Sequence, residues 1–141
     1  MPGEAAQSRT DAVVGRFAVA LDREDYAAAA ALLAAGCVYL IRGETHTGPG
    51  AIIASYRGNG EHAARSFESI TYSSSVRPDG PGSAQIEFAD HIRHRGMSLT
   101  HRCRQVATLG AHGLIARIEH VDLPGERERL DAFRRDCGLS E

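Results

Sequence analysis

The second half of this chain contains three runs in which apolar and polar residues alternate, the spacing of β-strands that bury one face. The apolar positions are Ile86, Phe88 and Ile92, then Leu99, Cys103, Ala107 and Leu109, then Leu114, Ala116 and Ile118. The same faces also carry five polar residues: Asp90, His101, Gln105, His120 and Asp122. A buried polar group costs free energy unless it is hydrogen-bonded. These side chains are therefore expected either to satisfy one another or to line a pocket.

The first half of the chain has helical spacing instead. Apolar residues recur with a helical period from Thr10 onward. Asp25 and Gly36 are suited to cap the two ends of an alanine-rich second helix, and Pro49 suits the first turn of a third. We expect strands over 37–42, 67–77, 83–95, 98–109 and 114–122, a polar turn over 43–48, and a last helix over 126–137. Helices followed by a strand meander predict one α+β domain over residues 10–137, after a flexible tail over 1–9.

The composition excludes several kinds of function. The net charge of -2 gives no general attraction to nucleic acid or to acidic membranes. The chain contains no lysine, so it has neither a Schiff-base lysine nor a phosphate-loop lysine. Its cysteines are too widely spaced for a zinc motif, and no apolar run is long enough to span a membrane. We therefore expect a cytoplasmic protein without a metal or a cofactor.

Several stretches, by their order and spacing, give the chain a resemblance to the NTF2-like superfamily, which includes ketosteroid isomerases and SnoaL-type polyketide cyclases. They are residues 13–17 (VVGRF), 21–26 (LDREDY), 32–39 (LLAAGCVY), 48–52 (GPGAI), 55–56 (SY) and 113–118 (GLIARI). The resemblance covers residues 10–123. It implies a cone in which three N-terminal helices pack on a curved antiparallel sheet around an internal pocket, with frequent homodimers through the outer sheet face.

The catalytic residues of the ketosteroid isomerases can be placed on this sequence one by one, and most are missing. The catalytic aspartate of that family falls on Leu40, and the tyrosine of its oxyanion hole falls on Phe17. Its protonated aspartate falls on Gln105, which still donates hydrogen bonds, and one pocket tyrosine matches at Tyr56. The resemblance therefore implies a related pocket but not the known isomerase reaction.

The turns between the alternating runs predict which polar residues face each other. A two-residue turn over 96–97 places His101 opposite Ile92, and a four-residue turn over 110–113 places it opposite Asp122. Directly opposite side chains on one face lie within hydrogen-bonding reach. A carboxylate beside an imidazole fixes the tautomer of the ring and raises its basicity. The His101–Asp122 pair is therefore our candidate general base.

The other inward-facing residues receive supporting roles in this hypothesis. His120 is a candidate second acid or base, and Gln105 and Tyr56 are candidate hydrogen-bond donors to a substrate oxygen. The rest of the predicted pocket wall consists of Asp90, Phe17, Leu40 and Cys103.

Two classes of function remain open on the sequence alone. The first is a SnoaL-like domain that binds a small apolar or carbonyl-bearing molecule and, if it is an enzyme, performs cofactor-free isomerisation, cyclisation, dehydration or hydrolysis. The second is a non-catalytic binding or dimerisation module that uses the outer sheet face, where we expect Val106, Ile115 and Val121. Metal binding is a weaker alternative, because only His101 and His120 with one carboxylate share a face and no compact ligand motif is present.

Overall fold

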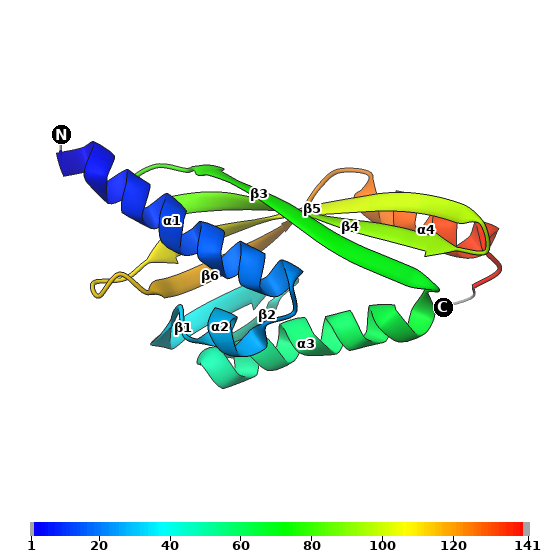
Figure 1. Cartoon of the computed structure of the whole chain (residues 1–141), viewed down its shortest axis with the longest axis horizontal. Coiled ribbons are helices and arrows are strands. Elements are labelled where there is room, and N and C mark those ends of the chain that lie inside the picture. Colours follow the sequence, from blue (N-terminus) through cyan, green and yellow to red (C-terminus); the bar gives the residue numbers. More distant parts are fainter. Residues whose placement is uncertain (1, 140–141) are drawn as a thin grey trace.

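The computed structural model describes residues 2–139, without the side chains of residues 2–6 and 8. These residues form four helices on a six-stranded sheet (Figure 1). The helices are α1 (Pro2–Asp22), α2 (Tyr26–Ala30), α3 (Pro49–Ser66) and α4 (Glu126–Asp136). The strands are β1 (Leu33–Ile41), β2 (Glu44–Thr47), β3 (Ser69–Pro78), β4 (Ser83–His94), β5 (Met97–Leu109) and β6 (Ile115–Asp122).

The sheet is curved and unclosed, with the strand order β2-β1-β6-β5-β4-β3. All neighbouring strands are antiparallel except β1 and β6, which are parallel. Helix α1 packs against β3 and β4, α3 against β1 and β2, and α4 against β5. Figure 1 shows α1 and α4 at opposite ends of the molecule. The α+β class and the curved sheet are therefore confirmed, but the sheet is mixed rather than purely antiparallel.

Two apolar clusters hold the helices to the sheet. The larger one joins Phe17 of α1 and Ile52 of α3 to Ile86 of β4, and all three are fully buried. The smaller one packs Phe133 of α4 against Phe67, the residue that follows α3 and caps its end. Burying each such side chain contributes about 1.5–3 kcal/mol relative to leaving it exposed. Members of both clusters, among them Phe88 of the larger and Ala63 of the smaller, line the cavity that holds the candidate site.

The N-terminal segment is helical where we expected a tail. Helix α1 begins at Pro2, so residues 2–9 continue the helix that the apolar spacing predicts from Thr10. Gln7 ties this segment to the sheet, because its side-chain amide donates to the Ser83 carbonyl at 3.1 Å.

The alanine-rich second helix is much shorter than its composition indicates. Helix α2 ends at Ala30, and β1 begins at Leu33, which lies opposite Ile115 of β6. Pairing with the sheet and burial override the helix propensity of the alanines that follow. The segment expected as a polar turn forms β2, because the chain reverses earlier, at Arg42 and Gly43, whose φ angles are 47° and 81°.

The predicted strand faces are largely correct, but the predicted register is wrong. The β4–β5 turn consists of Arg95 and Gly96, with φ angles of 50° and 78°, and not of residues 96–97. Left-handed φ angles at both positions characterise a tight two-residue hairpin turn. The shift places His101 opposite Asp90 instead of Ile92.

The β5–β6 pairing contains an irregularity that the sequence does not reveal. The register shifts between Thr108 and Leu109, so Cys103 lies opposite Asp122 and the predicted His101–Asp122 pair does not form. The same shift turns Ile115 inward, where it is completely buried. It was predicted on the outer face.

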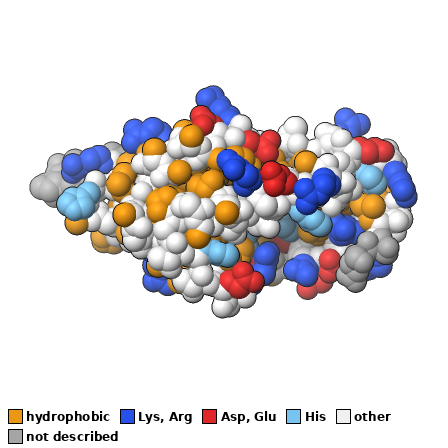
Figure 2. Space-filling view, turned by 90° about the horizontal axis from the view of Figure 1, so that it is seen from below, with side chains coloured by type: hydrophobic (Ala, Val, Ile, Leu, Met, Phe, Trp, Pro, Cys, Tyr) orange, Lys and Arg blue, Asp and Glu red, His pale blue; other side chains and the backbone are white. Residues whose placement is uncertain are grey.

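The outer face of the long strands is mixed in character. Its charged residues include Arg102 and Glu87, whose side chains pair at 3.4 Å, and Arg117 and Glu119, which pair at 3.7 Å. Val121 is the exposed large apolar side chain of this face, at 39% exposure. Seen from below, apolar side chains gather over the end of the molecule that holds β1 and β2, and charged side chains gather over the other end (Figure 2).

None of the helices described in residues 2–139 has the length and apolarity that a membrane span requires.

Candidate functional site

A cavity of about 270 Å³ opens between the helices and the inner face of the sheet. Leu21, Ile41 and Phe88 supply apolar wall. All four tyrosines of the chain line the cavity: Tyr26, Tyr39, Tyr56 and Tyr72. An apolar cavity with a few converging polar groups is the usual form of a small-molecule site.

A chain of hydrogen bonds forms one end of this cavity. Tyr56 donates to Gln105 Oε1 at 2.6 Å, and Gln105 Nε2 donates to the Tyr39 hydroxyl at 2.9 Å. The two tyrosine rings stack with centroids 4.9 Å apart. Burial raises the pKa of Tyr39 to about 12, so its phenol keeps its proton and is able to donate it in a hydrogen bond. We call Tyr39, Gln105 and Tyr56 the donor end of the pocket.

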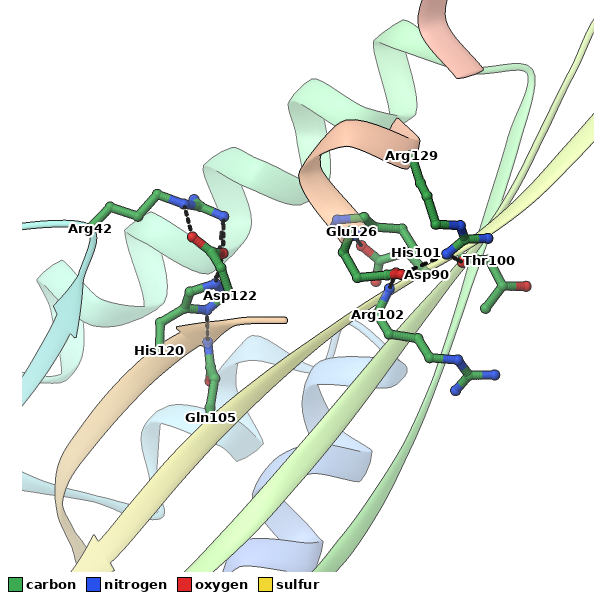
Figure 3. A network of polar contacts seen from close by, with 10 residues as sticks. All are labelled: Arg42, Asp90, Thr100, His101, Arg102, Gln105, His120, Asp122, Glu126 and Arg129. Atoms are coloured by element: carbon green, nitrogen blue, oxygen red, sulfur yellow. Dashed lines mark hydrogen bonds and ion pairs between the residues drawn. The ribbon is translucent and has the colours of Figure 1, made fainter. Parts of the chain in front are cut away.

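The hydrogen-bond chain continues from the donor end to the protein surface (Figure 3). Gln105 Nε2 lies 3.2 Å from His120 Nδ1, and His120 Nε2 lies 2.8 Å from Asp122 Oδ1. Arg42 donates to both carboxylate oxygens of Asp122, at 2.9 and 3.2 Å. Burial lowers the pKa of His120, although Asp122 acts in the opposite direction. Hydrogen bonds from Arg42 lower the pKa of Asp122. Near neutral pH the His120 imidazole is therefore neutral and the Asp122 carboxylate is charged.

A second histidine–carboxylate pair lies on neighbouring strands of the pocket wall. His101 Nδ1 is 3.9 Å from Asp90 Oδ2, and both residues face the cavity. The N-terminus of α4 packs beside this pair, because Glu126 accepts a hydrogen bond from the Arg102 amide at 2.6 Å (Figure 3). Cys103 lies between the two histidine pairs. Burial raises the pKa of its thiol to about 12, so it packs as a small neutral side chain and is not a nucleophile.

Carboxyl groups and phenols gather at the other end of the cavity. Asp22, at the end of α1, accepts a hydrogen bond from Ser74 at 2.5 Å through Oδ2. Its Oδ1 is buried and has no hydrogen-bond partner among residues 2–139. Burial raises the pKa of Asp22, the Ser74 hydrogen bond opposes this shift, and the charge of Asp90 adds to it. We call Asp22, Glu24 and Asp90, with Tyr72 beside them, the acidic end of the pocket.

The structure brings together most of the site residues that the sequence predicts. Five of the predicted residues line one cavity, although the predicted pair His101–Asp122 is replaced by His101–Asp90: His101, His120, Tyr56, Gln105 and Asp90. Asp122 belongs to the rim, since its side chain is 53% exposed and pairs with Arg42 rather than His101. Cys103 also lines the cavity, as predicted.

Two residues placed by the isomerase resemblance do not line the cavity. Phe17 is fully buried behind the wall, where its ring packs edge-on against Tyr56 at 5.9 Å. Leu40 lies on the opposite face of β1 from its neighbours Tyr39 and Ile41, both of which line the cavity. The residues of β1 that reach the pocket are therefore Tyr39 and Ile41, on either side of the position that the resemblance implies.

Several wall residues were missed because they lie outside the three alternating runs. Asp22 ends α1, Arg42 is in the β1–β2 turn, and Tyr72 is on β3. The strand pattern of β1 could have indicated Tyr39, because it has the same parity as the buried Cys37. The weaker metal hypothesis is also corrected. Within residues 2–139, no three histidine, cysteine or carboxylate side chains are placed to hold one ion.

The comparisons with known proteins show the fold. No family model and no curated protein matches the sequence. A candidate polyketide cyclase from Sinorhizobium meliloti matches with a TM-score of 0.60 and 22% identity, over 77% of this chain and 93% of that one. One from Xanthomonas campestris matches with a TM-score of 0.64 and 16% identity, over 82% and 90%. The chain therefore has the SnoaL-like α+β fold.

Two further matches are proteins whose descriptions name a ligand. A Mycobacterium tuberculosis protein in complex with estradiol-17beta-hemisuccinate has a TM-score of 0.62 and 15% identity, over 84% of this chain and 96% of that one. A computationally designed 17-OHP binder has a TM-score of 0.59 and 14% identity, over 84% and 93%. At these identities the likeness is one of fold alone, and function has to be argued from the site.

Proposed function

We propose that this chain binds a small, mostly apolar molecule with a carbonyl group and catalyses cofactor-free proton transfer at the carbon next to that carbonyl. The observation that carries the proposal is the presence of a histidine–carboxylate pair and a phenol donor in one largely apolar cavity. The folds of candidate polyketide cyclases and of steroid binders support a ring-containing ligand. The acidic end suits a hydroxyl group at the far end of the same ligand.

In this mechanism His101 is the base and Tyr39 holds the oxygen. The carbonyl oxygen accepts a hydrogen bond from the Tyr39 hydroxyl, which stabilises the negative charge that develops on it. The carbon–hydrogen bond breaks as the proton moves to the His101 imidazole, and the electron pair passes to the oxygen to form an enolate. Asp90, 3.9 Å from the ring, stabilises the imidazolium. Return of the proton to a different carbon gives isomerisation, and attack of the enolate on a second carbonyl closes a ring.

Hydrogen–deuterium exchange tests the proton-transfer step directly. In deuterated buffer, 1-tetralone should lose the hydrogens next to its carbonyl at least about a hundredfold faster with the protein present, the lower end of what a positioned base provides. His101→Gln should abolish the acceleration. His112→Gln removes an exposed histidine in the β5–β6 loop and should leave it unchanged.

Occupancy of the pocket can be followed separately from the reaction. The chain has no tryptophan, and all four tyrosines line the cavity, so tyrosine fluorescence reports on this site. Quenching by 1-tetralone without accelerated exchange would refute catalysis and leave a non-catalytic binding protein. Neither quenching nor exchange would refute the proposed ligand class as well.

We also propose that the chain is one domain that forms a homodimer through the outer face of β5 and β6. Val121 and Val106 lie on this face, and the pairs Arg102–Glu87 and Arg117–Glu119 surround them. A partly apolar patch with a charged rim suits a self-complementary contact between two copies.

A further inference from the structure

A relay of three side chains links the surface to the donor end of the pocket, and no step of the proposed proton transfer uses it. Arg42 and Asp122 lie on the rim, and their side chains are about half exposed, at 49% and 53%. His120 lies beneath them, with a side chain only 7% exposed. Figure 3 shows the three side chains in line with Gln105, pointing from the rim into the molecule. Arg42 and His120 also line the cavity, and the relay reaches the Tyr39 hydroxyl through Gln105.

The position of the His120 proton follows from its neighbours. A carboxylate only accepts hydrogen bonds, so the 2.8 Å contact between Asp122 Oδ1 and His120 Nε2 requires the proton on Nε2. Arg42 Nη2, which only donates, lies farther from the same nitrogen, at 3.5 Å, so the shorter contact with Asp122 decides. Arg42 holds both carboxylate oxygens and keeps Asp122 charged and in place. The imidazole is neutral, so its Nδ1 carries a lone pair and can only accept.

The lone pair on Nδ1 in turn decides which way the Gln105 amide faces. Only the NH₂ group of Gln105 can make the 3.2 Å contact with His120 Nδ1. The same NH₂ group then donates to Tyr39 at 2.9 Å, and Gln105 Oε1 is left to accept from Tyr56 at 2.6 Å. The Tyr39 oxygen thus accepts a hydrogen bond from Gln105. The proton of the Tyr39 hydroxyl is directed either at the neighbouring Tyr56 oxygen or at a ligand oxygen in the cavity.

We infer that Arg42, Asp122 and His120 are positioning residues that fix the direction of these hydrogen bonds, so that Tyr39 offers a proton and the pocket selects ligands whose oxygen only accepts. This inference rests on the proposed function, which places the ligand carbonyl at Tyr39. It adds a specificity determinant that extends from the rim to the donor end and sets the hydrogen bonds that Tyr39 offers.

The opposite arrangement shows why the relay decides specificity. With a proton on His120 Nδ1, the Gln105 amide would turn and present its oxygen to both His120 and Tyr39. Tyr39 would then donate to Gln105 and offer only lone pairs to the cavity. A carbonyl would face a lone pair there and lose its partner, whereas an N–H donor would gain one.

Nitrogen-15 NMR of the histidine side chains tests the relay without any ligand. Near neutral pH, wild-type His120 should show a protonated Nε2 and an unprotonated Nδ1. A protonated Nδ1 in the wild type would overturn the inference, whatever the protein binds. This result is independent of the 1-tetralone experiment, so failure of the relay and failure of the proposed function can be told apart.

A pair of bicyclic probes tests the consequence for specificity. The carbonyl of 1-indanone only accepts, and the N–H of indole only donates, while the two molecules are similar in size. Asp122→Asn replaces the acceptor facing His120 with an amide that can donate to it. The preference for 1-indanone over indole should then fall about tenfold, the equivalent of roughly one hydrogen bond.

Glu119→Gln is the matched control, because it makes the same charge change on the outer face of the same strand. It should keep the wild-type preference. An equal preference in Asp122→Asn and Glu119→Gln would overturn the inference. Since the Asp122 side chain is 53% exposed, its substitution removes no core packing, and circular dichroism can confirm that both variants fold.

Discussion

Tyr39 is the residue at which the pocket is expected to meet a ligand oxygen. Tyr39→Phe keeps the ring that stacks on Tyr56 at 4.9 Å and removes only the hydroxyl. We expect the affinity for 1-indanone to fall about tenfold, because one hydrogen bond to the carbonyl is lost. The affinity for indole should change much less, since indole has no oxygen to bind. Titration of both probes by NMR measures the two affinities, and an equal loss for both would show that Tyr39 acts through shape alone.

His120 should make the protein less stable in mild acid. Burial lowers its folded-state pKa below the ordinary value of 6.5, so the unfolded chain takes up the proton more readily than the folded one. Stability therefore falls as the pH drops through this value and stops falling below the folded-state pKa. Asp122 has a pKa lowered from 3.8, so its contribution is lost only in stronger acid.

Urea unfolding at about pH 7 and about pH 5.5 measures this dependence within the histidine range. His120→Gln should lose less stability between the two conditions than the wild type, while His112→Gln, in an exposed loop, should behave like the wild type. An unchanged pH dependence in His120→Gln would mean that the ring takes up its proton in the folded state without cost.

At the level of single elements, the faces of the strands could be predicted and their register could not. Alternation depends only on the local period of two, which is why Asp90, His101 and Gln105 were placed correctly on the inner face. Register depends on the turns. Arg95 adopts a left-handed φ of 50°, which non-glycine residues rarely do, and no residue marks the irregularity beside Thr108.

In the β4–β5 turn, replacing Gly96 with alanine should destabilise the protein, whereas the same replacement at Gly58 of α3 should not. Gly96 has a φ of +78°, and open space surrounds its position, so Gly96→Ala tests backbone conformation alone. We expect a loss of about 1–2 kcal/mol in the free energy of unfolding. Gly58, inside α3 and also in open space, has no such φ angle. Gly58→Ala should therefore stabilise the protein by roughly 0.5–1 kcal/mol.

Thermal or urea unfolding of the two variants gives the comparison. The same added methyl group should have opposite effects at the two positions. If Gly96→Ala were neutral, the turn would have to form in a different conformation, and the register that places Asp90 opposite His101 would be in doubt.

At the level of the whole molecule, only the part of the pocket wall that the sheet forms could be predicted from the sequence. That part follows from strand parity, which needs no knowledge of distant segments. The other half comes from elements that the fold brings over the sheet, including Asp22 at the end of α1 and Arg42 in a hairpin turn. Their arrival depends on helix packing and on the parallel β1–β6 pair, which spans most of the chain and leaves no local pattern.

The proposed homodimer is a property of the whole molecule, and one exposed valine offers a direct test of it. Val121 is 39% exposed on the outer face of β6, and Arg104 lies opposite it on β5. Val121→Arg would place two like charges side by side in the middle of the proposed contact, so we expect it to convert the dimer to a monomer. Val19→Arg makes the same change at a valine that is 44% exposed on α1, and it should leave the dimer intact. Sedimentation velocity at micromolar concentration measures both. A wild-type monomer, or dissociation by both variants, would contradict the proposed interface.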